Sequence, residues 1–280
     1  MPDRAAPWDA VATERLYDRW IISPFAPGVD FRLPRDVRRL LARWTRLGGI
    51  GRRVVLDVGC GRGDATALVA GRVGFAAALD ISRPMLELSR RFLATHGISS
   101  THYQGRDALV RMATDLGAVA AGRRRGPATA LARADLRDLS RLRATGDLVL
   151  AINSIIPPRA SEAARMFGEL ANTLKPGGVL MAVLPSLESF EYMLDLARRR
   201  GAPLREAGRM DACGMFHESG ETQKFFTSDE VRALCRTSGL RGVTLATVRY
   251  PWALMARFGW GNFPGSPRLW DWYLVARAAR

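Results

Sequence analysis

The residues from Val54 to Thr66 (VVLDVGCGRGDAT) constrain the fold of this chain more than any other segment. They begin with an apolar, β-branched run without polar alternation, which is typical of a strand buried on both faces of a parallel sheet. Gly59, Gly61 and Gly63 follow at alternate positions, where they let the backbone turn sharply and approach a ligand closely. A helix predicted from Asp64 to Ala70 then points free N–H groups and its positive dipole end at that ligand. The segment therefore predicts a strand, a ligand-binding loop and a helix.

A second buried strand is predicted at residues 75–80, and it ends in Asp80. Asp80 lies 19 residues after Gly61, where a doubly wound sheet places the acidic residue that binds ribose hydroxyls. A carboxylate offers two acceptor oxygens to a vicinal diol. The alternative is that Asp80 caps the helix that begins near Pro84. Capping does not explain the spacing from the glycine loop, so we predict a ribose-binding role.

The composition is that of a globular protein with a substantial core. The chain has 280 residues, of which 48% are hydrophobic and 25% are charged. No apolar stretch approaches the length of a membrane span, and the first residues lack the apolar core of a signal peptide. Cys60, Cys213 and Cys235 are odd in number and lack metal-ligand spacing, which is typical of reduced thiols in the cytoplasm. We therefore expect a cytoplasmic protein without a membrane partner or a metal site.

The net charge of +15 suggests an anionic partner such as RNA. Lysine occurs only at Lys175 and Lys224, so arginine carries nearly all of the positive charge. This pattern favours a compositional bias and a solvated basic surface. The densest arginine runs, at residues 123–125 and 198–200, fall at predicted helix ends, where cations suit the helix dipole. An RNA partner stays open as the alternative.

Apolar runs and helical periodicity alternate along the chain in the βαβ manner. We predict strands at residues 53–58, 75–80, 128–134, 147–153 and 178–184. We predict helices at residues 63–72, 84–95, 159–174 and 228–238. Two more strands, from Gly239 to Tyr250 and from Trp270 to Ala276, are expected to form a terminal antiparallel hairpin.

Three segments extend beyond this alternating core. Residues 1–50 have helical periodicity with aromatic side chains, and they predict an N-terminal helical cap in front of a domain at residues 51–280. Residues 103–126 predict a helical insertion, and residues 185–226 predict a lid-like insertion after the fifth strand. Long excursions at the carboxyl ends of sheet strands usually shape access to a substrate.

The glycine loop has the spacing G-x-G-x-G, with Asp57 two positions before Gly59. A nicotinamide or flavin fingerprint has a different spacing, G-x-G-x-x-G. The pattern resembles motif I of the class I S-adenosylmethionine (SAM)-dependent methyltransferases, and the resemblance covers residues 50–185 firmly and residues 225–278 more loosely. It implies an α/β fold with a Rossmann-like, doubly wound sheet of seven strands that ends in an antiparallel hairpin. It also implies SAM as the cofactor.

The resemblance further implies which residues bind SAM. The family's cofactor-binding positions correspond here to Asp57, Gly59, Cys60, Gly61, Gly63, Asp80, Ile81, Met85, Asp135, Leu136, Asn153 and Ser154. Asp135 matches the acidic residue that accepts a hydrogen bond from the adenine amine, while a neighbouring backbone N–H serves the ring nitrogen. The alternative is that Asp135 caps a short helix near Arg137. Asn153 and Ser154 are expected at the carboxyl end of the fourth strand, close to the methyl donor, and Asp147 at its other end has a structural role.

Few residues qualify as a catalytic base or as a lid. His217 lies beside Glu218 in the lid-like insertion and could deprotonate a hydroxyl or an amine; the alternative is a loop histidine without a catalytic task. Together with Glu221, these two residues lack the helical spacing of a metal site. Tyr17 and Trp20, one helical turn apart, could close over the sulfonium or the substrate by cation–π contact. The alternative is that both are core residues.

We expect the chain to transfer a methyl group to an oxygen or nitrogen of a small molecule, in a role such as secondary metabolism. DNA amino-methyltransferases carry an Asn/Asp-Pro-Pro-aromatic motif after the fourth strand, whereas here Pro157–Pro158 is followed by Arg159. Base C5-methyltransferases need a cysteine nucleophile near the fourth or fifth strand, and this chain has none there. The acceptor pocket is expected between the N-terminal helices, residues 185–226 and the Trp-rich loop at 252–272. An RNA methyltransferase and a SAM-binding protein without transferase activity stay open.

Overall fold

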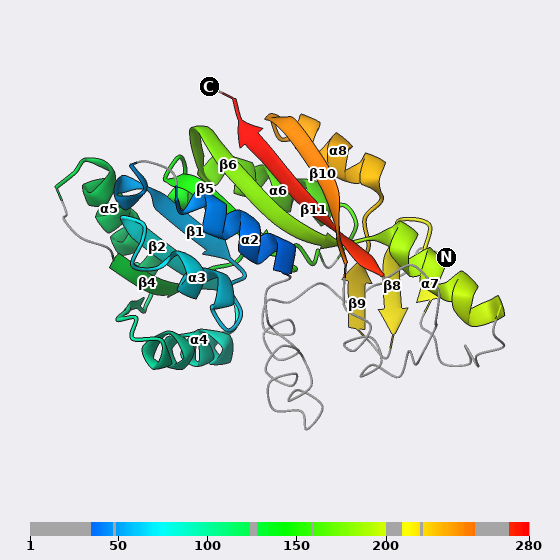
Figure 1. Ribbon diagram of the computed structural model, residues 1–280, viewed down its shortest axis with the longest axis horizontal. Coiled ribbons are helices and arrows are strands. Elements are labelled where there is room, and N and C mark those ends of the chain that lie inside the picture. The colour runs from blue at the N-terminus through cyan, green and yellow to red at the C-terminus, as the bar shows by residue number, and fades with distance from the viewer. Residues whose placement is uncertain are drawn as a thin grey trace.

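A sheet of eight strands forms the centre of the computed structural model, which describes residues 35–46, 49–123, 128–157, 159–199, 209–218, 221–249 and 269–279. The strands are β1 Val54–Val58, β2 Phe75–Asp80, β3 Thr101–Tyr103, β4 Ala128–Arg133, β5 Gly146–Ile152, β6 Leu174–Pro185, β10 Leu240–Arg249 and β11 Trp270–Ala278. Their order across the sheet is β10-β11-β6-β5-β1-β2-β4-β3 (Figure 1). All neighbours are parallel except the pairs β6–β11 and β10–β11. The expected doubly wound sheet with a terminal antiparallel hairpin is confirmed.

The sheet has eight strands where seven were expected. The extra strand is β3, whose residues Thr101–Tyr103 pair in parallel with Ala130–Ala132 at the edge of the sheet. Its three residues are exposed or half-buried and carry polar side chains. A segment that is so short and so polar has no strand periodicity to detect, so its pairing depends on the neighbouring strand.

The central strands are buried on both faces, as their apolar runs predict. Every residue of β1 and β2 is buried, including the acidic residues Asp57 and Asp80. β6 is longer than the strand predicted at 178–184, because Leu174 already pairs with Gly146 across a register shift. The Pro and Gly residues at 176–178 lie within β6, at this irregularity in its pairing.

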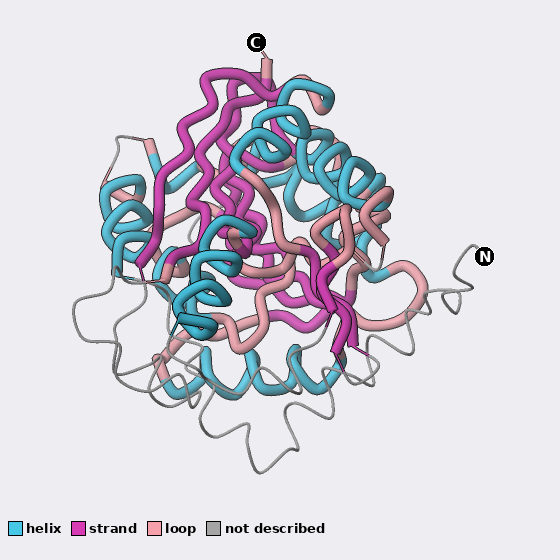
Figure 2. Tube along the Cα trace, turned by 90° about the vertical axis from the view of Figure 1, so that its right-hand side faces the viewer, coloured by secondary structure: helices cyan, strands magenta, loops and turns pink. Residues whose placement is uncertain are grey.

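Helices cover both faces of the sheet (Figures 1 and 2). The described helices are α2 Arg35–Trp44, α3 Asp64–Val69, α4 Arg83–Thr95, α5 Ala108–Ala120, α6 Glu162–Thr173, α7 Leu187–Arg199 and α8 Ser228–Thr237. Buried side chains of α2, α3 and α4 pack on one face, whereas those of α5, α6 and α8 pack on the other. The predicted helices at 63–72, 84–95, 159–174 and 228–238 correspond to α3, α4, α6 and α8.

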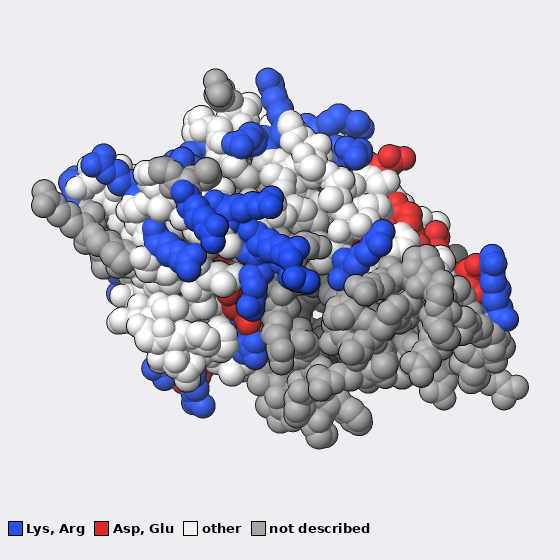
Figure 3. Space-filling view, in the orientation of Figure 1, with Lys and Arg blue, Asp and Glu red and all other residues white. Residues whose placement is uncertain are grey.

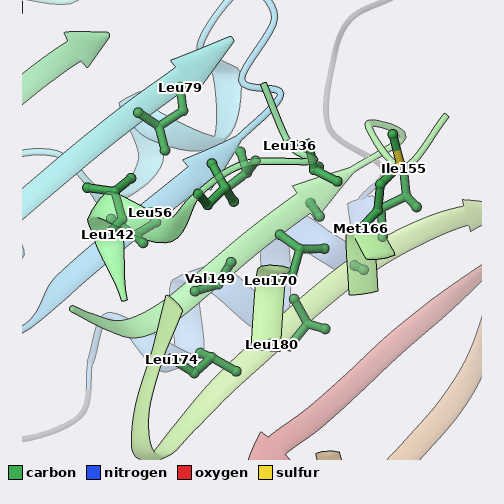
Figure 4. Close-up of a cluster of buried hydrophobic side chains, with 14 of the residues drawn as sticks. Leu56, Leu79, Leu136, Leu142, Val149, Ile155, Met166, Leu170, Leu174 and Leu180 are labelled. Atoms are coloured by element: carbon green, nitrogen blue, oxygen red, sulfur yellow. The ribbon is translucent and has the colours of Figure 1, made fainter. Parts of the chain in front are cut away.

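The core between the sheet and α6 is aliphatic and closely packed (Figure 4). Leu56 and Val149 from the sheet and Leu170 from α6 are completely buried there. Truncation of one such leucine to alanine typically costs about 2–5 kcal/mol. This packing holds the carboxyl ends of β1 and β5 at fixed positions relative to each other.

A second, three-stranded sheet follows α7 within the segment 185–226. It contains β7 Arg209–Met210, β8 Met215–Glu218 and β9 Glu221–Lys224, and a bridge between Ser186 and Phe226 joins this region to the end of β6. The Lys224 ammonium is only 1% exposed and donates hydrogen bonds to the carbonyls of Cys213 and Phe225 and to Glu230 of α8. A buried charge is tolerated only when it is paired in this way.

Several expected features fall outside the described residues. They include residues 1–34 of the expected N-terminal cap, with Tyr17 and Trp20, and the Trp-rich loop up to residue 268. Within the expected insertion at 103–126, the structure has α5. Among the described helices, none combines the length and the apolar character needed to cross a membrane.

Candidate functional site

The glycine loop lies at the carboxyl edge of the sheet, between β1 and α3. The backbone N–H groups of Gly59 and Cys60 both donate to the carbonyl of Leu79, at 2.7 and 2.9 Å. The Gly63 N–H donates to the Cys60 carbonyl at 2.8 Å. The loop is therefore fastened to the end of β2 through its own backbone.

All three loop glycines adopt positive φ angles, but their surroundings differ. A Cβ on Gly59 would lie 2.2 Å from the Cβ of Ser154, and a Cβ on Gly63 would lie 2.5 Å from Oγ of Ser89. These two glycines are required by close packing inside the protein. At Gly61 (φ 51°), in contrast, a Cβ would meet no heavy atom within 4 Å. Gly61 therefore faces open space that a ligand can occupy.

Asp80 links this open glycine to the second strand. Its Oδ2 accepts a hydrogen bond from the Gly61 N–H, and its Oδ1 accepts one from the Ser82 N–H, both at 2.9 Å. Burial raises the pKa of Asp80, whose side chain is 8% exposed, while these backbone donors favour the charged form. A carboxylate has about four acceptor positions, so Asp80 can also accept hydrogen bonds from a ribose diol.

The capping alternative for Asp80 is wrong, because Ser82 caps α4. The Ser82 hydroxyl accepts a hydrogen bond from the Met85 N–H at 3.2 Å, and Pro84 lies in the first turn. The spacing of 19 residues between Gly61 and Asp80 thus also has a structural consequence, because it lets the Asp80 carboxylate accept a hydrogen bond from the Gly61 N–H.

Asp57 lies beneath the loop and contacts α3. Its side chain is 3% exposed, and its Oδ2 accepts a hydrogen bond from the Thr66 hydroxyl at 2.6 Å. Burial raises the pKa of Asp57 to about 6, against the opposing effect of the Thr66 hydrogen bonds. Asp57 therefore fastens the first turns of α3 to β1 and positions the loop.

Cys60 contributes its backbone to the loop. Its thiol is buried and donates to the Gly61 carbonyl at 3.7 Å. Burial raises the pKa of this thiol well above its ordinary value, so the thiol stays neutral. No nucleophilic role follows for it.

The residues after β4 form a tight turn. Asp135 accepts hydrogen bonds from the Arg137 N–H at 2.9 Å and from the Arg137 guanidinium at 2.6 Å. Asp135 therefore caps a turn at residues 136–137, where the alternative had expected a short helix. Leu136 packs into the core, while the Arg133 guanidinium donates to the Ile81 carbonyl and ties the end of β4 to the end of β2.

Asn153 and Ser154 lie at the carboxyl end of β5, beside the glycine loop. The Ser154 hydroxyl donates to the Val58 carbonyl at 2.7 Å, and the Asn153 N–H donates to the Val183 carbonyl at 3.0 Å. Asn153 has a φ of 52°, a left-handed conformation that asparagine tolerates better than most residues. This bend leaves the Asn153 side chain exposed at the same edge as Gly61 and Asp80.

Of the two catalytic candidates, the structure describes only His217. His217 is exposed on β8, and its Nε2 lies 3.4 Å from Oδ2 of Asp211. None of its described contacts joins it to the glycine loop, and Tyr17 is outside the described residues. In the described part of the chain, no group of three or more His, Cys, Asp or Glu residues could hold a metal ion.

Two contributors were not singled out from the sequence. Thr66, the partner of Asp57, lies nine residues after it, in the first turn of the predicted helix. Arg133, the partner of the Ile81 carbonyl, lies within the third predicted strand and ends β4. The acidic residue before the glycines was the available signal for Thr66, because a buried carboxylate requires a donor.

The comparisons with known proteins agree with this geometry. Residues 55–115, which contain the loop and Asp80, match the family model of a methyltransferase domain. A SAM-dependent methyltransferase from Methanosarcina mazei superposes with a TM-score of 0.55 at 16% identity, over 89% of this chain and 99% of that one. No curated protein matches the chain by sequence.

Two further solved structures share the fold at low identity. The cyclase SpnF superposes with a TM-score of 0.59 at 14% identity, over 97% of each chain. A protein that converts a disulfide bond into a thioacetal group during echinomycin biosynthesis has a TM-score of 0.55 at 16% identity, over 95% of this chain and 93% of that one. At these identities the likeness concerns the fold.

Proposed function

We propose that the chain is a class I SAM-dependent methyltransferase, and that it transfers the methyl group of SAM to an oxygen or nitrogen atom of a small molecule. The match of residues 55–115 to the family model of a methyltransferase domain and the shared fold support this proposal. The proposal that SAM is the cofactor depends on one observation, which is the open space at Gly61 beside the Asp80 carboxylate. A side chain at Gly61 would fill that space, and Asp80 offers acceptors for a diol. The residues present therefore fit SAM.

The proposed cofactor-binding residues lie along the carboxyl edge of the sheet, and each group of them binds a different part of SAM. In our proposal, Asp80 binds the ribose hydroxyls, Asp135 and the Leu136 N–H bind the adenine, and the loop around Gly61 holds the amino-acid end. Asn153 and Ser154, at the end of β5, border the reacting end. Asp57, Ile81 and Met85 support the loop and the start of α4 from below, with Gly59, Cys60 and Gly63 forming the loop backbone.

SAM supplies a methyl group on a positively charged sulfonium, so the chain needs to align an acceptor with it and to keep water out. The fixed carboxyl ends of β1 and β5 provide the alignment, since the Ser154–Val58 hydrogen bond holds them together. The exposed Asn153 side chain can donate to or accept from an acceptor hydroxyl or amine. Its left-handed backbone fixes the direction of that side chain.

Support for a small acceptor comes from the segment 185–226 and from two similar folds. Phe190, Phe216 and Phe225 pack against one another, with Phe190 ring centroids 5.0 and 4.6 Å from the other two, so they stabilise this segment itself. Tyr192 and Trp270 form a separate, half-buried pair with centroids 6.0 Å apart, beside the end of β6. Such a pair suits a planar or partly apolar acceptor.

Two of the structural neighbours have chemistries other than nucleic-acid methylation. One is a cyclase, and the other forms a thioacetal group in echinomycin biosynthesis. They support a role in secondary metabolism, although one fold hosts many chemistries.

The arginines near the loop argue against the RNA alternative. Arg62 is paired with Asp64 at 2.8 Å, Arg137 with Asp135 at 2.6 Å, and Arg133 donates to a backbone carbonyl. Arginines that are engaged in this way are less available to phosphates. In Figure 3, one group of Lys and Arg side chains lies over α2, and others are scattered over the rest of the visible face.

A methyl-transfer assay tests the proposal. The purified chain is incubated with methyl-labelled SAM and either a panel of hydroxyl- and amine-bearing aromatic compounds or total RNA. We expect label in at least one small molecule, a loss of at least tenfold in D80N, and no loss in D229N, which alters an exposed carboxylate on α8. Label in RNA alone would favour the RNA methyltransferase, and SAM binding without any transfer would favour the inactive binding protein.

We also propose a cytoplasmic location. All three cysteines are free thiols in the structure, as expected where the environment is reducing. Fractionation of the producing cells, with an antibody against the chain, tests this.

A further inference from the structure

A concave site lies at the amino edge of the sheet, at the opposite end of β1 from the glycine loop. It is a cavity of about 470 Å³. Its walls include Trp44, Arg53, Asp147, Gly177, Gly178 and Arg277. Arg53 immediately precedes β1, while the glycine loop follows the other end of that strand. Five residues of strand separate the two sites by roughly 17 Å, so a ligand in this cavity does not touch the reacting atoms.

Two arginines, Arg53 and Arg277, bring positive charge to the cavity. Within the described part of the chain, neither Arg53 nor Arg277 forms an ion pair with a carboxylate. Asp147 does not neutralise them, because its Oδ2 accepts hydrogen bonds from Lys175 Nζ at 2.6 Å and from the Val54 N–H at 2.8 Å. The cavity therefore attracts an anion.

The register of the terminal hairpin adds to this charge. Arg277 of β11 lies directly opposite Arg241 of β10, and both side chains are exposed. Directly opposite residues of an antiparallel pair share one face of the sheet, where like charges destabilise the pairing. An anion bound at Arg277 would relieve that repulsion.

The remaining walls give the site shape. The Arg53 guanidinium lies 5.8 Å from the ring centroid of Trp44, whose side chain is 6% exposed and forms a fixed wall. Gly177 has a φ of 74°, and a Cβ there would meet no heavy atom within 4 Å, so its backbone is open to a ligand, as at Gly61. Strands β1 and β11 are three strand spacings apart, about 14 Å, which two arginine side chains can bridge through one anion.

We propose that this cavity binds a small phosphate-bearing molecule, with its phosphate group between Arg53 and Arg277. The planar guanidinium matches the tetrahedral oxygens of phosphate with paired hydrogen bonds. The volume falls in the range of small-molecule sites. A cavity lined by two arginines suits a single phosphate group better than the continuous backbone of RNA.

Thermal unfolding in the presence of inorganic phosphate tests this assignment. A ligand that binds only the folded chain raises the melting temperature with its concentration, and the concentration dependence yields a Kd. Sodium chloride and sodium acetate at equal ionic strength serve as the reference arms. The variants are R277Q and R53Q, with R236Q as the matched control, because Arg236 is an exposed arginine on α8 outside the cavity.

We expect phosphate to stabilise the wild type and R236Q equally, and to bind R277Q and R53Q about tenfold more weakly, as loss of one charged hydrogen-bond partner implies. SAM binding by R277Q stays unchanged, which separates this site from the proposed function. Equal phosphate binding by R277Q and R236Q would overturn the proposal, as would an acetate effect as large as that of phosphate. Binding of a short single-stranded RNA that is insensitive to R277Q, without an effect of phosphate, would also overturn it.

Discussion

Substitution of the loop glycines by alanine separates packing from ligand binding. G59A forces a Cβ to within 2.2 Å of the Ser154 Cβ, in a backbone with φ of 69°. The left-handed conformation costs an alanine about 1–2 kcal/mol, and overpacking adds about 1–3 kcal/mol. G59A is therefore expected to lower the free energy of unfolding by about 2–5 kcal/mol.

G61A is expected to affect SAM affinity more than stability. Its φ of 51° imposes the same conformational cost of about 1–2 kcal/mol, but its Cβ meets no protein atom. That Cβ instead enters the space that we assign to SAM. We expect a modest loss of stability together with a loss of SAM affinity of at least tenfold.

Gly97 provides the matched control. It has a φ of 69° with no heavy atom near its Cβ position, and it follows α4, away from the loop. G97A should lose about as much stability as G61A and bind SAM as the wild type does. Urea unfolding measures the stabilities, and isothermal titration calorimetry measures the affinities.

A double variant tests the clash itself. S154G removes the Cβ and hydroxyl that G59A would meet, so G59A/S154G should be less destabilised than the sum of the two single variants, by about 1–3 kcal/mol. The reasoning is refuted if G59A is no less stable than G97A, or if G61A and G97A bind SAM equally well.

Three further predictions concern charged and titratable groups. The pKa of Asp57 is about 6 in the folded chain and near 4 in the unfolded chain, so the folded chain holds this proton more tightly. Asp57 therefore adds about 3 kcal/mol to the free energy of unfolding below pH 4, and this contribution is lost as the pH rises through 6. In D57N, the difference in unfolding free energy between pH 4.5 and pH 7 should be smaller than in the wild type. K224M leaves two carbonyls and Glu230 without their buried donor, so urea unfolding should show a loss of about 3 kcal/mol, and a loss below 1 kcal/mol would contradict the described pairing. H217Q should leave kcat within twofold of the wild type, because His217 contacts Asp211 on the small sheet, and a tenfold fall with an altered pH profile would instead assign it as the base.

The parts of the fold that could be predicted are those with a strong local signal. The unbroken apolar runs before Asp57 and Asp80 are buried on both faces, as such runs are in a parallel sheet. The glycine spacing located the loop. The residues at the two ends of the 19-residue interval, Gly61 and Asp80, are joined by a direct hydrogen bond. In each case the requirement lies within a short stretch of chain.

The parts that could not be predicted depend on contacts distant in sequence. β3 exists through pairing with β4, and Lys224 is buried because its carbonyl partners and Glu230 surround it. The different tasks of Gly59 and Gly61 depend on Ser154, which lies almost a hundred residues further along the chain. Glycine spacing alone does not distinguish a glycine that packs from one that faces a ligand.

A crystal structure of the chain soaked with SAM tests the central claim most directly. Our account predicts electron density for an adenosyl group over Gly61, with the ribose hydroxyls on the Asp80 carboxylate and the sulfonium toward Asn153. Density in another place, or an unchanged loop together with no heat of binding in calorimetry, would contradict it.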